Sequence, residues 1–339
     1  MVAAVKRAVR RIAEEALAPL APSSWRLQPR PSLLVLMYHR VLPADHPDRA
    51  IEQPGMYVAP QTLDMHLAVV KRHMTIVHLD EWMRRAVEGE PLPERACALT
   101  FDDGWQDNFE HAFPVLRRHG APATIFLVSA MTGSTREFWP NRLARLLSQP
   151  GADEPLPTRL ADVLEPVVAH ARAAGRWSLE DLDRAIVLAK QLAETELDDL
   201  LAAAQETRGV PAGRRAVLNE EELRAMAGSG LVRFGSHTRT HCRFRGELPL
   251  AVLEREIAGS RSEIAAYVGT AAVGVFCYPN GDTTPAAVDV VRRNYAAAVT
   301  TRRGWHHASA DRFLMHRVGV HDDISNRPAG FLARLSGWS

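Results

Sequence analysis

Short apolar segments alternate with helical patterns along most of the chain, and this alternation restricts the fold more than any other feature. Each apolar segment has the length of a buried strand, and caps or helical periodicity mark the segments between them. Parallel strands need long crossover connections, so strands that alternate with helices predict a parallel α/β sheet or barrel. Functional residues of such folds gather at the carboxyl ends of the strands. The predicted strands are 33–38, 75–79, 96–101, 123–128, 231–237, 273–278, 296–301 and 313–320.

One long segment interrupts the alternation. From about residue 138 to residue 208 the pattern is helical and rich in Ala, Leu, Glu and Arg. Ser178 and Asp181 have the S-x-x-D spacing of a capping box that opens a helix. We therefore expect a helical insertion within the α/β fold. The expected parts are an N-terminal amphipathic helix and linker (1–30), a barrel in two pieces (31–136 and 216–325), the insertion (137–215) and a C-terminal tail (326–339).

The overall composition excludes several classes of protein. Lys and Arg number 41 against 40 Asp and Glu, so the balance of charge does not favour a nucleic-acid partner. The three cysteines lack C-x-x-C spacing, which argues against a disulfide framework. No apolar run approaches the length that spans a bilayer, and the N-terminus lacks the apolar core of a signal peptide. The expected location is therefore the cytoplasm.

The N-terminal segment leaves two interpretations open. Val5, Val9, Ile12 and Ala16 recur at helical spacing, and basic residues lie among them. This pattern is typical of an ordinary amphipathic helix that packs on the domain. It is also typical of a helix that makes peripheral contact with a membrane, here at the inner membrane face.

Two predicted strand ends carry the residues with most chemistry. Asp102 and Asp103 follow a strand in "TFDDG", and His237 and His241 follow another in "GSHTRTH". Two imidazoles and one carboxylate can hold a divalent metal with open positions for water. Alternatively, the aspartates form only a turn before Gly104 and the histidines make local hydrogen bonds. A turn accounts for one aspartate at this position but not for two adjacent ones. A bound cation would neutralise one carboxylate and leave the other ionised as a base.

A third strand end opens into the stretch "FCYPNGD" at 276–282. Pro279 and Gly281 are typical of a plain type I or II turn. The alternative is a loop at the rim of the site, with a backbone N–H that faces a developing oxyanion.

Together these stretches resemble the polysaccharide deacetylases of carbohydrate esterase family four, which carry the NodB homology domain. "TFDDG" (Thr100–Gly104) is similar to the first motif of the family, "SHTRTH" (Ser236–His241) to the second and "YPNG" (Tyr278–Gly281) to the third. "MYHRV" (Met37–Val41) is similar to the opening strand of many members. The resemblance implies a distorted (β/α)7 barrel that binds one divalent metal, usually Zn²⁺, with Co²⁺, Ni²⁺ or Mn²⁺ as alternatives.

The resemblance also implies roles for particular residues. Asp103, His237 and His241 would be the metal ligands, and Asp102 would be the general base. The backbone N–H of Asn280 would stabilise the oxyanion. One departure stands out: the family's arginine before the proline of the third motif, which orients the base, has no counterpart within 274–278.

The general acid is less well defined by the motifs. The family's last motif, a histidine after a leucine, is matched only loosely by "FLMHR", which makes His316 the first candidate. The alternative for His316 is a strand residue that faces away from the site. His39, at the end of another predicted strand, is a rival, and His306 and His307 are further candidates.

Substrate contacts are expected from residues beside these motifs. Tryptophans stack well on sugar rings, although a tryptophan is more commonly buried; Trp139 and Trp305 are additional stacking candidates. Cys242 directly follows a predicted ligand, but adjacent residues rarely reach one ion together, so we expect Asp103 in its place. The expected substrate-binding residues are Tyr278, Pro279, His39 and Trp105.

The predicted function is metal-dependent removal of acetyl groups from an N-acetylated sugar, oligosaccharide or polysaccharide precursor. Two alternatives remain: an amidohydrolase or O-deacetylase that acts on another substrate, and a non-catalytic carbohydrate-binding relative. The second is disfavoured because binding alone does not need Asp102 beside a full ligand set. The sugar and the oligomeric state are not specified by the sequence.

Overall fold

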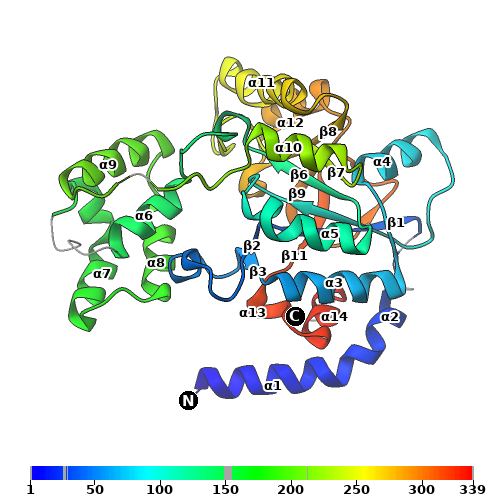
Figure 1. Cartoon of the computed structure of the whole chain (residues 1–339), viewed down its shortest axis with the longest axis horizontal. Helices are drawn as coiled ribbons and strands as arrows, with labels where there is room; N and C mark the ends of the chain where they lie inside the picture. The colour runs from blue at the N-terminus through cyan, green and yellow to red at the C-terminus, as the bar shows by residue number, and fades with distance from the viewer. Residues whose placement is uncertain (1, 26–27, 29, 149–154, 212, 338–339) are drawn as a thin grey trace. The chain divides into compact units, whose positions relative to one another are not determined.

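The structure is a computed structural model that describes residues 2–25, 28, 30–148, 155–211 and 213–337 (Figure 1). The chain divides into two compact units. The first comprises Met1–Pro43, Tyr57–Ser134 and Val217–Ser339, and the second comprises Ala44–Met56 and Thr135–Ala216. Within the described residues, no helix combines the length and the apolar character needed to cross a bilayer.

The first unit is built on a closed barrel of parallel strands. Within the described residues, the strands pair in the order β1, β11, β9, β8, β7, β6, β5, and β5 pairs with β1 to close the ring. The predicted distorted (β/α)7 barrel is therefore confirmed. The distortion lies beside β1, which pairs along its length with β5 but meets β11 at Leu36–Val318 and Met37–Gly319. The strands are β1 (Ser32–Tyr38), β5 (Ala96–Phe101), β6 (Ala123–Leu127), β7 (Val232–Ser236), β8 (Ala272–Cys277), β9 (Ala297–Arg303) and β11 (Met315–Gly319).

In the part of the chain that the structure describes, four two-residue strands supplement the barrel. β4 (Thr75–Ile76) extends the sheet beyond β5, and β10 (His306–His307) pairs antiparallel with the start of β1. β2 (Arg40–Val41) and β3 (Tyr57–Val58) form a separate pair. β4 was predicted because it lies within the apolar run 75–79. The other three were missed, because two residues are too few to show the alternation of a strand.

Side chains alternate between the two faces of each barrel strand, and this alternation positions the site. In β5, Cys97, Leu99 and Phe101 join the apolar cluster outside the ring, whereas Ala96 and Ala98 join the cluster inside it. Because successive residues of a strand point to opposite faces, the inward series continues through Thr100 to Asp102. Residues of α4, among them Trp82 and Met83, pack into the same interior cluster.

Helices surround the barrel strands. Residues 326–339 were expected to be a tail, but α14 packs on the unit: the Phe331 ring is buried and stacks on His66, with ring centroids 3.8 Å apart. Residues 338–339 lie outside the described residues. The helices of this unit are α1 (Val2–Leu17), α2 (Ala21–Ser24), α3 (Pro60–His73), α4 (Leu79–Glu88), α5 (Phe113–His119), α10 (Glu220–Gly228), α11 (Leu250–Val268), α12 (Pro285–Asn294), α13 (Asp322–Ser325) and α14 (Pro328–Leu335).

The second unit is a helical cluster with its own apolar core. Its helices are α6 (Trp139–Ser148), α7 (Thr158–Ala174), α8 (Leu179–Ala189) and α9 (Glu194–Thr207). The capping box predicted at Ser178 and Asp181 is present at the start of α8. The expected insertion, 137–215, falls in this unit, although 149–154 and 212 lie outside the described residues. The segment Ala44–Met56, which the sequence analysis assigned to the barrel, clusters with these helices instead.

Candidate active site

The two aspartates at the end of β5 point in different directions because the chain turns between them. Asp102 continues the inward series of the strand. Asp103 has a φ of 74° and Gly104 a φ of 72°, so the backbone enters the left-handed region directly after Asp102. Gly104 is required there, because a Cβ would lie 2.8 Å from a methyl carbon of Leu127. The turn expected as an alternative is thus present, and it leaves both carboxylates free for separate roles.

Asp103 lies against the two histidines that follow β7. Its Oδ1 is 3.4 Å from Nε2 of His237 and 3.6 Å from Nε2 of His241. The three candidate ligand atoms all lie within 4.8 Å of one another. A tetrahedral ion with bonds of about 2.0–2.1 Å needs donor atoms roughly 3.3–3.4 Å apart. The spacing around Asp103 therefore fits a divalent metal.

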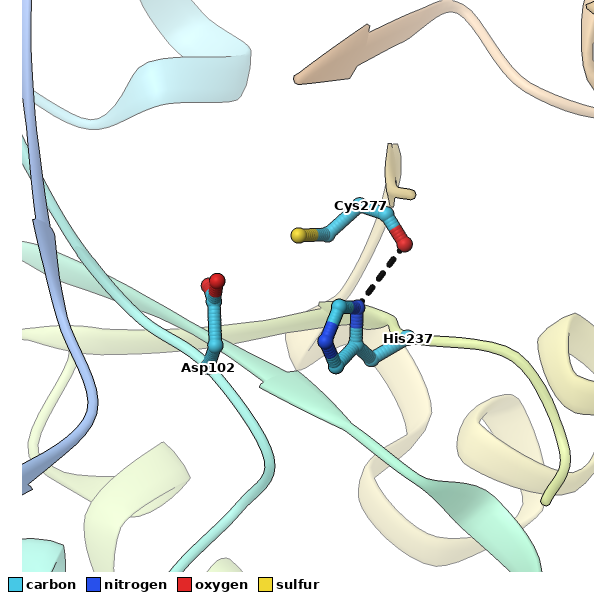
Figure 2. A group of neighbouring side chains, drawn as sticks. All are labelled: Asp102, His237 and Cys277. Atoms are coloured by element: carbon cyan, nitrogen blue, oxygen red, sulfur yellow. Dashed lines mark hydrogen bonds between the residues drawn. The ribbon is translucent and has the colours of Figure 1, made fainter. Parts of the chain in front are cut away.

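Neighbouring groups orient the candidate ligands. Nδ1 of His237 lies 2.8 Å from the backbone oxygen of Cys277 (Figure 2), and donation there leaves Nε2 as a free acceptor. Burial lowers the pKa of His237 to about 4, so the imidazole is neutral near pH 7. Nε1 of Trp105 donates to Oδ2 of Asp103 at 3.0 Å, which leaves Oδ1 facing the histidines.

Trp105 is itself fixed by a buried ion pair. The Arg40 guanidinium lies 4.3 Å from the centre of the indole ring, and its Nε donates to Asp107 at 2.9 Å. Both members of this pair are almost fully buried. Trp105 was expected to contact substrate, but its side chain is also buried. In this structure it positions Asp103.

Asp102 is held by an arginine that the sequence analysis did not identify. Arg317 of β11 donates from Nη1 to Oδ1 and from Nη2 to Oδ2 of Asp102, both at 2.7 Å. It also donates to the Thr300 carbonyl, the Thr100 hydroxyl and the Cys277 sulfur. Each of the five guanidinium N–H groups thus has an acceptor. Arg317 supplies from the last barrel strand the contact to Asp102 that the third motif lacks.

The same ion pair determines the charge of Asp102. Burial alone would raise the pKa of this carboxyl, but the adjacent Arg317 guanidinium outweighs burial and holds the pKa well below its usual range. Asp102 is therefore ionised at neutral pH even though its side chain is buried.

Asp102, His237 and Cys277 form a second cluster of potential ligand atoms (Figure 2). This cluster is a poor cation site, because Arg317 contacts two of its three members. Burial also raises the pKa of the Cys277 thiol far above its usual value, so the sulfur stays protonated. The set around Asp103 is the better candidate.

The candidate general acids lie in different places. Nε2 of His39 is 3.8 Å from Oδ2 of Asp102, and the His39 side chain is 22% exposed. His316 precedes Arg317 in β11, so its side chain points to the opposite face of the strand. It lies beside Gly304, whose added Cβ would be 3.0 Å from the His316 ring. The structure thus brings His39, and not His316, to Asp102.

The other histidine and tryptophan candidates make structural contacts. The His306 ring packs against Trp82, and Nδ1 of His307 pairs with the hydroxyl of Ser309. Trp305 donates to a backbone carbonyl of α14 at 3.2 Å. Trp139 begins α6 in the second unit and packs against that unit's core.

The loop after β8 contributes backbone and core contacts. Tyr278 and Pro279 are buried, and the Tyr278 ring packs edge-on against Phe276. Both residues were expected to contact substrate, and both side chains are buried. Asn280 is exposed with a φ of 55°. Gly281 is required, because its φ is 73° and a Cβ there would clash with the Thr301 hydroxyl.

Known proteins are similar to this chain in sequence and in fold. The sequence model described as "Polysaccharide deacetylase" matches residues 89–154 and 200–299. The chain is 26% identical over 114 residues to YxkH of Bacillus subtilis, a match that covers 33% of this chain and 37% of YxkH. It is 28% identical over 211 residues to the poly-beta-1,6-N-acetyl-D-glucosamine N-deacetylase of Staphylococcus epidermidis, covering 59% and 70% of the two chains.

Solved structures agree at the level of the fold. The deacetylase PplD of Streptococcus pyogenes, determined in complex with acetate, superposes with a TM-score of 0.58 and 17% identity, covering 90% of this chain and 98% of PplD. Together with the closed barrel and the matched motifs, these likenesses define the class. The chain is similar to the polysaccharide deacetylase family in sequence and has the same fold as PplD.

Proposed function

We propose that this protein is a metal-dependent deacetylase that hydrolyses the acetamido group of an N-acetylated carbohydrate. One observation carries the proposal: a set of three potential metal ligands around Asp103 lies next to Asp102, a separate ionised carboxylate. A purely structural turn needs neither the oriented histidines nor the ion pair. A hydrolase that activates water needs both a cation site and a base.

Asp103, His237 and His241 would hold the metal. Two imidazoles and a carboxylate are the ligands of many zinc sites, so Zn²⁺ is the first choice and Co²⁺, Ni²⁺ or Mn²⁺ are alternatives. When bound, the divalent ion lowers the pKa of a coordinated water and polarises the acetyl carbonyl.

Asp102 would act as the general base. Its two oxygens each accept one hydrogen bond from Arg317, which leaves further lone pairs for the proton of the attacking water. Arg317 keeps the carboxylate ionised and fixes its orientation, so it is a positioning residue. The backbone N–H of Asn280 would stabilise the negative charge that develops on the acetyl oxygen.

His39 would act as the general acid in place of His316. Its imidazole is partly exposed and lies 3.8 Å from Asp102, so it can meet a substrate nitrogen that approaches the proposed base. Protonation of that nitrogen releases the free amine and completes cleavage of the C–N bond.

An N-acetylated oligosaccharide is the substrate class best supported. The relative from Staphylococcus epidermidis is named for deacetylation of poly-beta-1,6-N-acetyl-D-glucosamine. The substrate of this chain is proposed by analogy with that name and by the chemistry of the site.

Acetate release by the purified full chain tests the proposal. The substrates are β-1,6-linked and β-1,4-linked N-acetylglucosamine oligomers, an O-acetylated sugar and a small acetanilide. We expect acetate from at least one oligomer, its loss after chelation, and its recovery on addition of Zn²⁺ or Co²⁺. Exclusive release from the O-acetylated sugar or the anilide would identify an O-deacetylase or amidohydrolase instead. A metal-loaded chain that releases acetate from none of them would overturn the proposal.

A further inference from the structure

The N-terminal helix α1 packs on its own unit through a charged residue. Glu14 of α1 is 6% exposed. It accepts hydrogen bonds from Arg327, beside the start of α14, at 2.7 Å and from Arg10 of α1 at 2.8 Å. Gly330 of α14 leaves room for this carboxylate, because an added Cβ would lie 3.3 Å from it. Among the α1 side chains that the structure describes (9–17), Glu14 is the one that is buried, so this part of the helix packs through a polar group.

The apolar side of the same helix is exposed. Val9 and Ile12 are one turn apart and are 61% and 70% exposed. Leu17 at the end of the helix and Leu20 just after it are 39% and 56% exposed. An amphipathic helix of a globular domain normally buries its apolar stripe against the core, and α1 does the reverse. In Figure 1, α1 runs along the lower edge of the picture, on the side of α14 away from the barrel strands.

Positive charge borders the exposed apolar side. Arg10 and Arg11 are exposed on α1 itself. Arg303, at the end of β9, donates to the backbone oxygen of Arg334 on α14. The guanidinium groups of Arg303 and Arg10 lie near that of Arg334, and together with burial they lower the pKa of Arg334 to about 10. Positive charge gathered in this way favours the binding of anions. Glu14 is paired with both Arg327 and Arg10, and Glu15 with Arg327, so these two carboxylates face five arginines: Arg10, Arg11, Arg303, Arg327 and Arg334.

We propose that α1 binds the surface of an anionic lipid bilayer, with Val9, Ile12 and Leu20 inserted at the acyl boundary and the arginines near lipid phosphates. An exposed apolar stripe flanked by basic residues is the pattern of helices that lie in the plane of a membrane interface. A second copy of the chain is a poorer occupant. In a two-fold dimer this surface would meet itself, so that Arg10, Arg11 and the rest of the basic cluster would face their own counterparts.

Co-sedimentation of the full chain with large unilamellar vesicles tests the proposal. We expect binding to vesicles of phosphatidylglycerol and phosphatidylcholine, weak binding to phosphatidylcholine alone, and weakening by salt. Ile12→Glu should weaken binding by roughly tenfold or more, because a buried isoleucine contributes about that factor. Val87→Glu is the matched control: Val87 is 57% exposed on α4, and its replacement should leave binding unchanged. Arg11→Gln should weaken binding by roughly fivefold, and only to anionic vesicles.

Several outcomes would overturn the proposal. These are the absence of binding to anionic vesicles, equal loss of binding in Ile12→Glu and Val87→Glu, or a concentration-dependent dimer in light scattering that Ile12→Glu abolishes. Acetate release from a soluble oligomer is measured in parallel and should not change in Ile12→Glu. Failure of vesicle binding with acetate release intact would refute the role of α1 and leave the proposed deacetylase function standing.

Discussion

Replacement of Arg317 by methionine is the most informative change, because this side chain contacts the proposed base and none of the proposed metal ligands. The substitution leaves Asp102 charged, 2% exposed and without its bidentate partner. Removal of one member of a buried ion pair costs about 3–5 kcal/mol of unfolding free energy. Methionine fills most of the volume of the arginine side chain. The loss of unfolding free energy therefore reflects lost charge and hydrogen bonds more than a new cavity.

The Arg317→Met variant should also be a slow enzyme that still holds its metal. A positioned base contributes roughly 10²–10⁴-fold to the rate, and we expect kcat to fall by about 10²-fold when the base loses its orientation. KM should change little, since the interaction acts in the transition state. Arg317→Lys keeps the positive charge but cannot bridge both carboxylate oxygens, so it should recover part of the stability and part of kcat.

Three measurements decide the outcome: urea denaturation, acetate-release kinetics and elemental analysis of bound metal. Arg40→Met is a matched control, because it breaks another buried ion pair and acts on Asp103 through Trp105. It should cost similar stability yet retain kcat when metal is saturating. A double-mutant cycle with Asp102→Asn should show a coupling of at least about 2 kcal/mol. The reasoning is refuted if Arg317→Met keeps kcat within twofold, or if its cost in stability is the same when residue 102 is asparagine.

Three further predictions concern single residues. Asp103→Asn should lose bound metal in elemental analysis, whereas Asp102→Asn should keep it and lose roughly 10²–10⁴-fold in kcat; the opposite pattern would reverse the assigned roles. His39→Gln should lower kcat by roughly 10²-fold while His316→Gln stays near the parent, and equal rates for the two variants would remove His39 as the acid. Burial lowers the pKa of His66 to about 3, below its value in the unfolded chain, so folding stability should fall as pH falls below about 6.5. Between pH 7.5 and pH 5 urea denaturation should show the parent losing about 2 kcal/mol more than His66→Gln, and parallel curves would contradict this account.

Much of the fold could be predicted from the sequence because the barrel strands are continuous apolar runs separated by capped helices. Once the strands were predicted, the residues that follow them could be assigned to a common site, since the carboxyl ends of parallel strands share one side of a barrel. The proximity of Asp103, His237 and His241 follows from that rule. The orientation of their side chains does not follow from it. The Cys277 carbonyl, 40 residues from His237, orients that imidazole, and the Trp105 indole orients the Asp103 carboxylate.

Arg317 was missed for a related reason. A motif search finds residues at fixed spacing, and the arginine that contacts the base lies on a different strand from the one where the family motif would place it. The signal was present one position after His316: Met315 joins the interior cluster, so alternation points Arg317 inward and His316 outward. Tyr278 shows a second limit of motif reasoning, because its motif suggests a contact at the site while the apolar residues around it place its ring in the core.

Closure of the barrel has a consequence for how the protein is made. β1 begins at Ser32, and its partner β11 is the last strand of the ring, ending at Gly319. During synthesis, the three motifs that carry Asp102, Asp103, His237, His241 and Asn280 leave the ribosome before the strand that carries Arg317. Until then the edges of β1 and β9 that later pair with β11 lack that partner, and unpaired edges invite association with other chains. Products of premature termination before Met315 would therefore contain the first three motifs, lack the Arg317 contact to Asp102 and be prone to aggregation.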